Sequence, residues 1–491
     1  MSIEKQAIKG VLWNSVERFS TQGIQFVLTI VIARILSPND YGLVAMLSIF
    51  LSIAQTLVDS GFANALIQKN NRTDTDYSTT FHFNLVISLL IYLVLYFTAP
   101  LIARFYDQPL LTLITRVLGL TLIINSFSIV QQAHLTVLLD FKKQAFASLL
   151  SVIIGGGVGI WMAYHGYGVW TLVWQTLISA TFNSIFLWIY AHWTPRWIFS
   201  WRSFHELFSF GSKIMLSAML HTIYTNMYSL VVGKAFNAAT LGYFNRAYTL
   251  GQFPVQNFSN IVLKVIYPIQ CHYQNDNEKF NYIFINYLRL SCFILFPLMI
   301  SFAALAKPIV IILLTDKWLP AVPLLQIICI AQMWDPVMKI NASALDAKGR
   351  SDYRLYSEIL KKIVAFGILF LSIPLGMKAI CGGLVLYAFA DMAIIISYSR
   401  KVMNRGYRWQ AGVLLPLLLA SISMGGLIFW IIRYFDSPWQ QLVFGFFIGL
   451  FFYIGVSYFC KFSEIHYFYL LLKGKKKIDE YNEDHEKGDL V

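Results

Sequence analysis

Polar side chains recur at steps of three and four residues in an apolar segment near the start of the chain. Such steps place residues on one face of a helix. The members of this stripe are Asn14, Arg18, Thr21, Gln25 and Thr29, with Glu17 beside them. A second segment lies 200 residues later. At this constant offset, Ser217, His221, Thr225 and Ser229 align with Glu17, Thr21, Gln25 and Thr29. The spacing predicts two equivalent helices whose polar faces line one water-filled cavity; ordinary hydrogen bonding between helices is the alternative.

Four basic residues within or beside apolar segments predict a cationic binding site. They are Arg18, Arg246, Lys213 and Lys339. Arginine suits phosphate because its planar guanidinium donates two parallel hydrogen bonds. Two of the four have simpler interpretations. Lys213 lies near a helix end, where its charge can extend to the surface, and Lys339 can pair with Asp335 four residues earlier.

Acidic residues in the same segments are candidates for coupling transport to an ion, either H+ or Na+. These candidates are Glu17, Asp59 and Asp391, and His221 can also take up a proton near neutral pH. Asp59 can instead cap or pair at a helix end. The five cysteines are scattered without metal-ligand spacing, so we expect no metal site and no cofactor.

The elements that must position these residues are membrane-spanning helices. The chain has 491 residues, of which 57% are hydrophobic and only 13% are charged. A soluble chain carries about 25% charged residues, so we predict an all-α polytopic membrane protein. Hydropathy predicts about fourteen spans. Their centres lie near residues 22, 50, 92, 122, 154, 179, 222, 253, 296, 331, 365, 389, 421 and 449.

An internal repeat divides this helical chain. Residues 31–50 read VIARILSPNDYGLVAMLSIF and residues 231–250 read VVGKAFNAATLGYFNRAYTL, so Gly42 aligns with Gly242 without a gap. Six spans separate the copies, and an even number predicts parallel repeats around a pseudo-twofold axis along the membrane normal. The predicted parts are a six-helix lobe 1–191, an interfacial linker 192–210, a second six-helix lobe 211–400, a further pair of spans 401–462 and a cytoplasmic tail 463–491.

The distribution of basic residues predicts the orientation in the membrane. With the N-terminus inside, the inner loops collect roughly three times as many Lys and Arg residues as the outer loops. The residues assigned to inner loops include Lys142, Lys143, Lys361 and Lys362. Both termini are therefore expected in the cytoplasm. This asymmetry also explains much of the net charge of +13, so nucleic-acid binding is not expected.

The run ERFSTQGIQFVLTIVIARILSPNDYGLVAM, followed by DSGFANALIQKN, resembles the start of bacterial polysaccharide-export flippases. These are the Wzx-type transporters of the multidrug/oligosaccharidyl-lipid/polysaccharide exporter superfamily. The resemblance implies two six-helix lobes around a cavity in a bacterial cytoplasmic (inner) membrane. It implies translocation of undecaprenyl-pyrophosphate-linked sugar repeats by alternating access, for O-antigen, capsule or exopolysaccharide. Implied partners are the lipid-linked oligosaccharide, membrane lipids, and a polymerase and chain-length regulator of the same pathway. Related flippases carry cavity arginines on spans one and eight, the spans of Arg18 and Arg246.

Two other functions remain open from the sequence. A drug/cation antiporter of the same superfamily favours an acidic, aromatic cavity over a cationic one. A membrane-embedded polymerase or glycosyltransferase usually carries a sizeable extracytoplasmic loop, and the longest predicted outer loop, around Lys307 to Leu319, is short. We therefore expect a transporter and not an enzyme.

Overall fold

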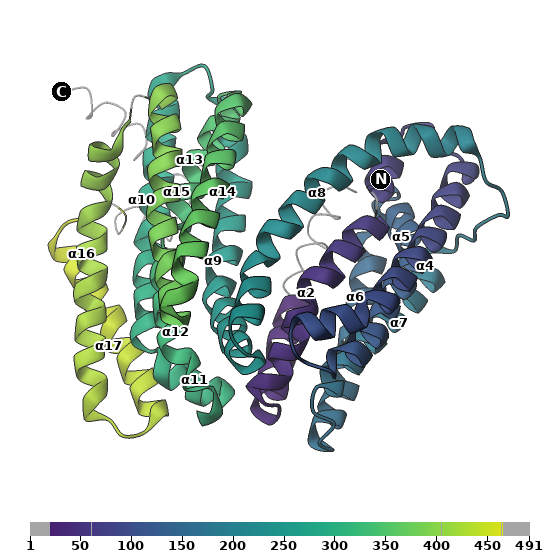
Figure 1. Cartoon of the computed structure of the whole chain (residues 1–491). Coiled ribbons are helices and arrows are strands. Elements are labelled where there is room, and N and C mark those ends of the chain that lie inside the picture. The colour runs from purple at the N-terminus through teal and green to yellow at the C-terminus, as the bar shows by residue number, and fades with distance from the viewer. Residues whose placement is uncertain (1–19, 60, 404, 463, 465–491) are drawn as a thin grey trace. The chain divides into compact units, whose positions relative to one another are not determined.

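The computed structural model describes residues 20–59, 61–403, 405–462 and 464, and every regular element in these ranges is helical. The chain divides into two compact units, Met1–Asn245 and Arg246–Val491. Ten helices in the described ranges are long and apolar enough to cross a membrane. The protein is therefore a multi-pass helical membrane protein, and each unit is described separately below (Figure 1).

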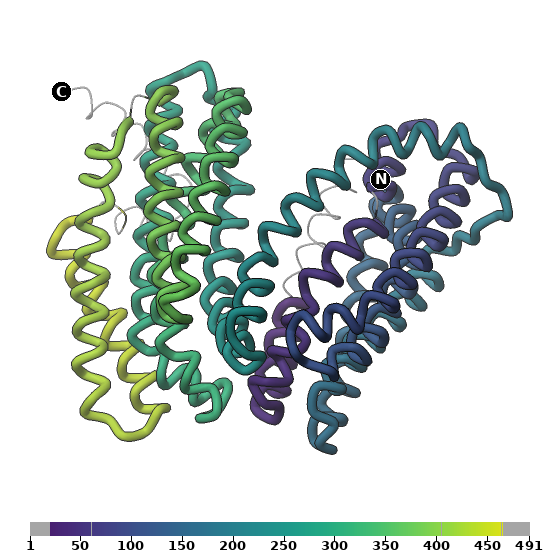
Figure 2. Tube along the Cα trace, viewed as in Figure 1, coloured from purple at the N-terminus to yellow at the C-terminus, as the bar shows by residue number. Residues whose placement is uncertain are grey.

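The first unit begins with the helix Ser20–Ile35. Its further helices are α2 (Pro38–Asp59), α3 (Phe62–Gln68), α4 (Asp74–Phe105), α5 (Leu111–Val137), α6 (Phe141–Tyr164), α7 (Trp170–Ala191) and α8 (Trp201–Ala235). Helix α9 (Ala238–His272) begins in this unit and continues into the second. Helices α4, α5, α6 and α7 pack side by side, and Figure 2 traces them in blue.

The second unit contains the rest of α9 and a further set of helices. These are α10 (Asn277–Ala304), α11 (Ala306–Leu314), α12 (Ala321–Gln332), α13 (Asp335–Ala347), α14 (Ser351–Ser372), α15 (Met377–Met403), α16 (Tyr407–Ile431) and α17 (Pro438–Phe459). The predicted terminal pair of spans corresponds to α16 and α17, and both pack on α10. The hydroxyl of Tyr453 on α17 donates to the carbonyl of Phe293 on α10 at 3.0 Å.

All fourteen predicted span centres fall within helices. Four of these helices are not among the ten that qualify as spans by length and composition: Ser20–Ile35, α8, α9 and α14. They include the two helices for which the sequence predicts polar stripes. A polar stripe lowers hydropathy, and it is unfavourable against hydrocarbon on all sides. The helix Ser20–Ile35 is apolar and falls outside the ten because its described part is shorter than 18 residues, whereas α8, α9 and α14 are long enough and differ from the ten in composition.

Side-chain caps set where several helices begin. Asp140, Ser200 and Asp276 each accept a hydrogen bond from a backbone N–H of the following first turn. Thr73 and Asp76 form a reciprocal capping box at the start of α4. Such caps satisfy backbone donors that have no partner within the helix.

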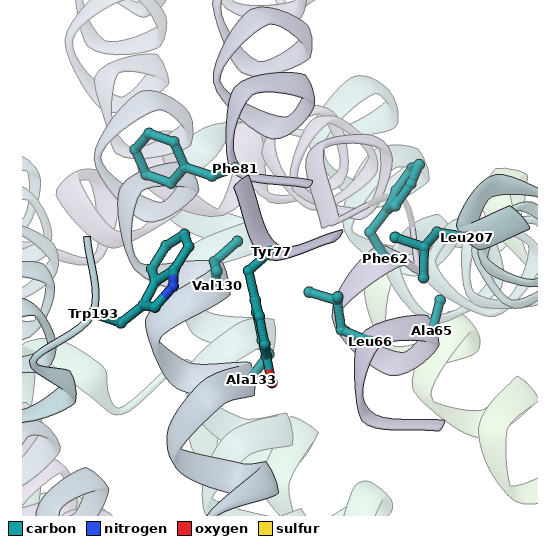
Figure 3. Packing of buried hydrophobic residues seen from close by; sticks show 9 residues of the cluster. All are labelled: Phe62, Ala65, Leu66, Tyr77, Phe81, Val130, Ala133, Trp193 and Leu207. Carbon is teal, nitrogen blue, oxygen red and sulfur yellow. The ribbon is translucent and has the colours of Figure 1, made fainter. Parts of the chain in front are cut away.

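The core at one end of the first unit joins α3, α4, α5 and α8 (Figure 3). Phe62 and Leu66 of α3 are completely buried, and Leu207 of α8 packs with them. Trp193, just beyond α7, lies in the same cluster. Burying these large side chains contributes about 1.5–3 kcal/mol each. The cluster therefore fixes the start of α8 against α3, α4 and α5.

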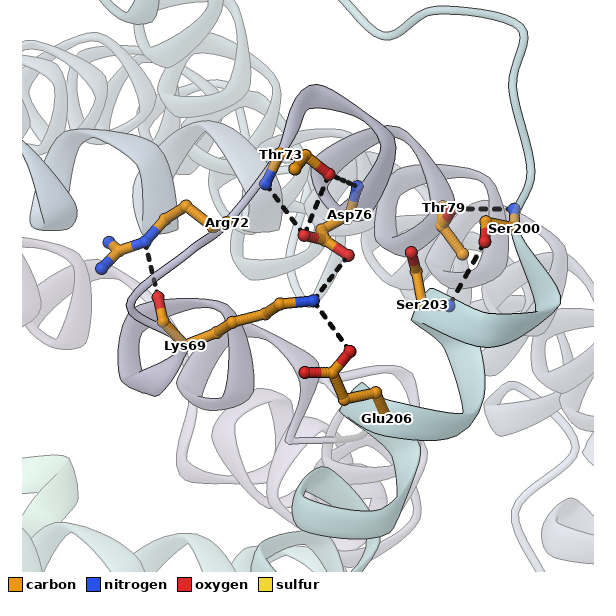
Figure 4. A network of polar contacts seen from close by, with 8 residues as sticks. All are labelled: Lys69, Arg72, Thr73, Asp76, Thr79, Ser200, Ser203 and Glu206. Atoms are coloured by element: carbon orange, nitrogen blue, oxygen red, sulfur yellow. Dashed lines mark hydrogen bonds and ion pairs between the residues drawn. The ribbon is translucent and has the colours of Figure 1, made fainter.

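The segment 192–210, predicted as an interfacial linker, contains a loop and the start of α8. Residues 192–200 are outside regular helix, and α8 begins at Trp201. A polar network holds this start to α3 and α4 (Figure 4). The ammonium of Lys69 lies 3.0 Å from carboxylate oxygens of both Asp76 and Glu206. Burial acts to lower the pKa of Lys69, but hydrogen bonds to the two carboxylates outweigh it and the pKa is raised.

The two repeated turns contact each other reciprocally within the first unit. A Cβ atom added at Gly42 would lie closer than 3.0 Å to the carbonyl of Ala238, and one added at Gly242 would do the same to the carbonyl of Pro38. Pro38 and Ala238 are equivalent in the repeat, as are Gly42 and Gly242. Only glycine permits backbones to approach this closely. The repeat found in the sequence is therefore a contact between α2 and the first turns of α9.

A buried amide network holds together α13, α15 and α16 of the second unit. The amide of Asn341 donates to the oxygen of Gln410 at 3.0 Å, and the amide of Gln410 donates back to Asn341 at the same distance. Ser399 donates to the same Asn341 oxygen at 2.7 Å. All three side chains are buried. Buried polar groups that satisfy one another in this way specify how helices pack.

Candidate functional site

The predicted stripe of the first helix lies partly outside the described residues. Asn14, Glu17 and Arg18 are outside them, so their predicted roles stay predictions. Thr21 and Gln25 lie in the helix Ser20–Ile35, where Gln25 is exposed. The Thr21 hydroxyl is buried without a hydrogen-bond partner among the described residues.

The predicted stripe of α8 forms an exposed polar face. Ser217, His221 and Thr225 are exposed along this helix, as is Lys213 one turn before them, whereas Ser229 is half-buried. The hydroxyl of Thr225 donates to the carbonyl of His221 at 3.0 Å, so this group is satisfied within the helix. On the neighbouring face, the hydroxyls of Thr222 and Thr56 lie 3.2 Å apart, which joins α8 to α2.

Asp59 ends a chain of hydrogen bonds inside the first unit. Asn125 of α5 donates to the side-chain oxygen of Gln55 on α2 at 3.0 Å, and Gln55 donates to Asp59 at 2.8 Å. The neighbouring Ser126 hydroxyl accepts from Ser88 of α4 at 3.0 Å. The chain to the carboxylate of Asp59 therefore joins α5 to α2, and a separate bond joins α4 to α5. This arrangement fits both predicted interpretations of Asp59, as an ion ligand and as a paired residue.

In the second unit, Lys339 pairs with Asp335 as its i,i+4 spacing predicts. The ammonium of Lys339 lies 3.0 Å from the Asp335 carboxylate, which also accepts a hydrogen bond from Ser259 of α9 at 2.5 Å. Arg246 lies near the start of α9 and is half-buried. Lys213 and Arg246 belong to different units, and Arg18 is not described. Convergence of the four predicted basic residues on one site therefore stays a prediction.

Asp391 forms a buried ion pair that the sequence did not reveal. Its carboxylate on α15 lies 2.7 Å from the ammonium of Lys361 on α14, and the two side chains are 13% and 4% exposed. Lys361 and Lys362 were assigned to an inner loop, and this assignment is wrong because both lie in the interior of α14. The signal that could have found Lys361 is its place in the buried stripe Ser357, Lys361, Ala365 and Leu369, at steps of four.

More charges gather around Lys361 on the same helix. Glu358 lies within 4 Å of three cations, at 3.4 Å from Lys361, 3.5 Å from Arg354 and 3.8 Å from Lys362. We call Arg354, Glu358, Lys361, Lys362 and Asp391 the α14 charge cluster. Buried ion pairs in a helix of a membrane protein are expected at sites that handle charged ligands or ions.

Comparison with solved structures defines the class of fold. The structure titled "Lipid II flippase MurJ, inward closed conformation" matches with a TM-score of 0.74 and 14% sequence identity, covering 94% of this chain and 100% of that one. An inward-facing multidrug resistance MATE family transporter of the MOP superfamily matches with a TM-score of 0.59 and 15% identity, covering 78% of this chain and 94% of that one. The chain has the helical membrane fold of these proteins.

Residues 31–323 match the family described as Polysaccharide biosynthesis protein. The match spans more than half of the chain, and the chain belongs to this family. Teichuronic acid biosynthesis protein TuaB of Bacillus subtilis (strain 168) is 28% identical over 361 residues, covering 72% of this chain and 74% of TuaB. Lipopolysaccharide biosynthesis protein WzxC of Escherichia coli (strain K12) is 23% identical, covering 74% of each chain. Succinoglycan biosynthesis transport protein ExoT of Rhizobium meliloti (strain 1021) is 25% identical, covering 67% of this chain and 66% of ExoT.

Proposed function

We propose that this protein is a flippase that moves undecaprenyl-pyrophosphate-linked oligosaccharide repeat units across a bacterial cytoplasmic membrane. The product serves the biosynthesis of a surface polysaccharide such as O-antigen, capsule or exopolysaccharide. The observation that carries the proposal is that the match to polysaccharide biosynthesis proteins lies within a fold shared with a lipid II flippase. The names of WzxC and ExoT, which describe lipopolysaccharide biosynthesis and succinoglycan transport, support it.

The proposed mechanism is alternating access between two parallel six-helix repeats, with fourteen spans in all and both termini in the cytoplasm. The reciprocal contact of the repeated turns around Gly42 and Gly242 supports a pseudo-twofold relation, because equivalent residues exchange equivalent contacts. The exposed polar face of α8, and the more polar composition of α8, α9 and α14 compared with the ten apolar spans, support a wet cavity that accepts the sugar. The coupling ion is proposed to be H+ or Na+, with Glu17, Asp59 and Asp391 as candidates.

A drug/cation antiporter shares the fold, since MATE transporters match the structure. The family match to polysaccharide biosynthesis favours the flippase over this alternative. The similarity to ExoT, which is named a transport protein, likewise favours a transporter over a membrane-embedded polymerase.

We expect Arg18→Ala and Arg246→Ala each to abolish surface polysaccharide while the protein still inserts in the membrane. Loss of a guanidinium removes a bidentate phosphate contact, which lysine replaces only as a point charge. Arg18→Lys and Arg246→Lys should therefore restore only part of the polymer. The measurement is the polysaccharide yield of a deletion strain that carries each variant, with membrane levels of the protein compared by immunoblot. Normal polymer levels in both alanine variants would contradict the cationic site.

A further inference from the structure

The α14 charge cluster contains two kinds of cation. Lys361 is buried and held by Asp391 at 2.7 Å. Arg354 and Lys362 are about one-third exposed, at 35% and 34%, and both lie near Glu358 at the longer distances of 3.5 and 3.8 Å. Ion pairs between half-exposed side chains are weak compared with buried pairs. Lys361 is therefore held in the interior by Asp391 and, at 3.4 Å, by Glu358, while the weaker pairs of Arg354 and Lys362 with Glu358 can be exchanged.

The cluster carries more positive than negative charge. Its three cations and two carboxylates leave a net charge of +1 among these five side chains, and the carboxylate of Asp346 on α13 also interacts with Arg354 and Glu358. Since Asp391 neutralises Lys361, Glu358 is left facing two further cations. Glu358 thus occupies the position of an anion between Arg354 and Lys362. A phosphate group at the same position offers more acceptor oxygens and more negative charge than one carboxylate.

An exposed apolar strip runs beside these charges on the same helix. Leu355, Ile359 and Ile363 are 59%, 51% and 63% exposed and follow one another at steps of four. Leu355 comes three residues before Glu358 and Ile359 three residues before Lys362, so the two strips are neighbours on the helix surface. Helix α14 therefore presents a charged strip and an apolar strip together. A lipid with a phosphate headgroup and a long hydrocarbon chain has this same combination of chemistry.

We propose that Arg354 and Lys362 bind the phosphate headgroup of a polyprenyl-linked lipid, with its chain along Leu355, Ile359 and Ile363. Glu358 holds the two cations in place without substrate and is displaced by the incoming phosphate. In the proposed orientation α14 begins at the cytoplasmic side, and Glu358 lies seven residues, roughly 10 Å, from the first residue. This subsite rests on the proposed flippase function and assigns an entry point for the substrate in the inner leaflet.

The test measures binding of undecaprenyl phosphate to the purified full-length protein in phosphatidylcholine nanodiscs. We expect the double variant Arg354→Gln/Lys362→Gln to weaken binding at least tenfold. Glu358→Gln should instead strengthen it several-fold, because the competing anion is gone. The matched control is Lys378→Gln/Arg433→Gln, which removes the same charge from exposed positions of the second unit and should leave binding unchanged. Thermal melting of each variant verifies folding.

Two further ligands identify the source of the phosphate. Inorganic pyrophosphate and phosphatidylglycerol are titrated in the same nanodiscs, and we expect both to bind far more weakly than undecaprenyl phosphate. Equal binding of either one would overturn the assignment to a polyprenyl lipid. Unchanged binding by the double variant, or weaker binding by Glu358→Gln, would overturn the subsite. The flippase proposal is tested separately, by whether the wild-type protein restores surface polysaccharide in a deletion strain. Failure of the subsite can therefore be distinguished from failure of the flippase proposal.

Discussion

Asp391→Asn is expected to lower the free energy of unfolding by about 1.5–3 kcal/mol, because it removes the closer of the two carboxylates that pair with the buried ammonium of Lys361. The side chain of Lys361 is only 4% exposed, and its nearest remaining carboxylate oxygen, on Glu358, is 3.4 Å away. Thermal and chemical unfolding of the purified protein in detergent would measure the loss.

Two control variants separate this pair from ordinary surface charges. Asp352→Asn removes a carboxylate from the exposed pair Arg350–Asp352 and should change stability little. Lys361→Met/Asp391→Leu removes both buried charges and should recover most of the stability, because well-packed apolar residues replace a buried pair at little loss. If Asp391→Asn unfolds no more easily than Asp352→Asn, the buried pair has no energetic role.

Gly42→Ala is expected to disrupt the first unit and abolish surface polysaccharide. The added Cβ would lie against the backbone carbonyl of Ala238, which, unlike a flexible side chain, cannot move aside alone. Overpacking of this kind costs about 1–3 kcal/mol and sometimes more. Gly242→Ala should behave in the same way, since its Cβ would meet the carbonyl of Pro38.

The matched controls are glycines with open space around them. Gly23 and Gly157 have nothing within 4 Å of an added Cβ, so alanine there should be neutral or stabilising by about 0.5–1 kcal/mol. Melting temperature and polymer yield are compared across the four alanine variants. The role of the repeated turn is refuted when Gly42→Ala and Gly157→Ala give the same melting temperature and the same yield.

The fold was predictable from the sequence because its signals are local. Apolar runs located all fourteen span centres within helices, and an ungapped repeat located the two equivalent turns, whose contact with each other only the structure shows. The pair Asp335–Lys339 followed from i,i+4 spacing alone. In each case the relevant residues lie within one helix or recur at a constant offset. The segment 192–210 was less clear, because aromatic residues suit both a surface loop and a helix start.

The missed features of the site depend on partners that are distant in sequence. Lys361 and Asp391 are thirty residues apart, and Asn341 meets Gln410 across 69 residues. A hydropathy profile assigns a lysine to a loop because it scores the residue type alone. It contains no information on a carboxylate of another helix that pairs with the lysine. For Lys361 that rule failed, since Asp391 of the neighbouring helix makes burial of the ammonium tolerable. Partner identity across helices comes only from the packed structure.

The central claim is that this protein carries a lipid-linked repeat unit from the inner to the outer leaflet. The most direct measurement is the amount and leaflet of the polyprenyl-linked repeat unit in cells that lack the protein, with and without a plasmid copy. We expect the intermediate to accumulate on the cytoplasmic leaflet in its absence and to clear when the wild-type protein is restored. No accumulation, or accumulation on the outer leaflet, would contradict the flippase assignment.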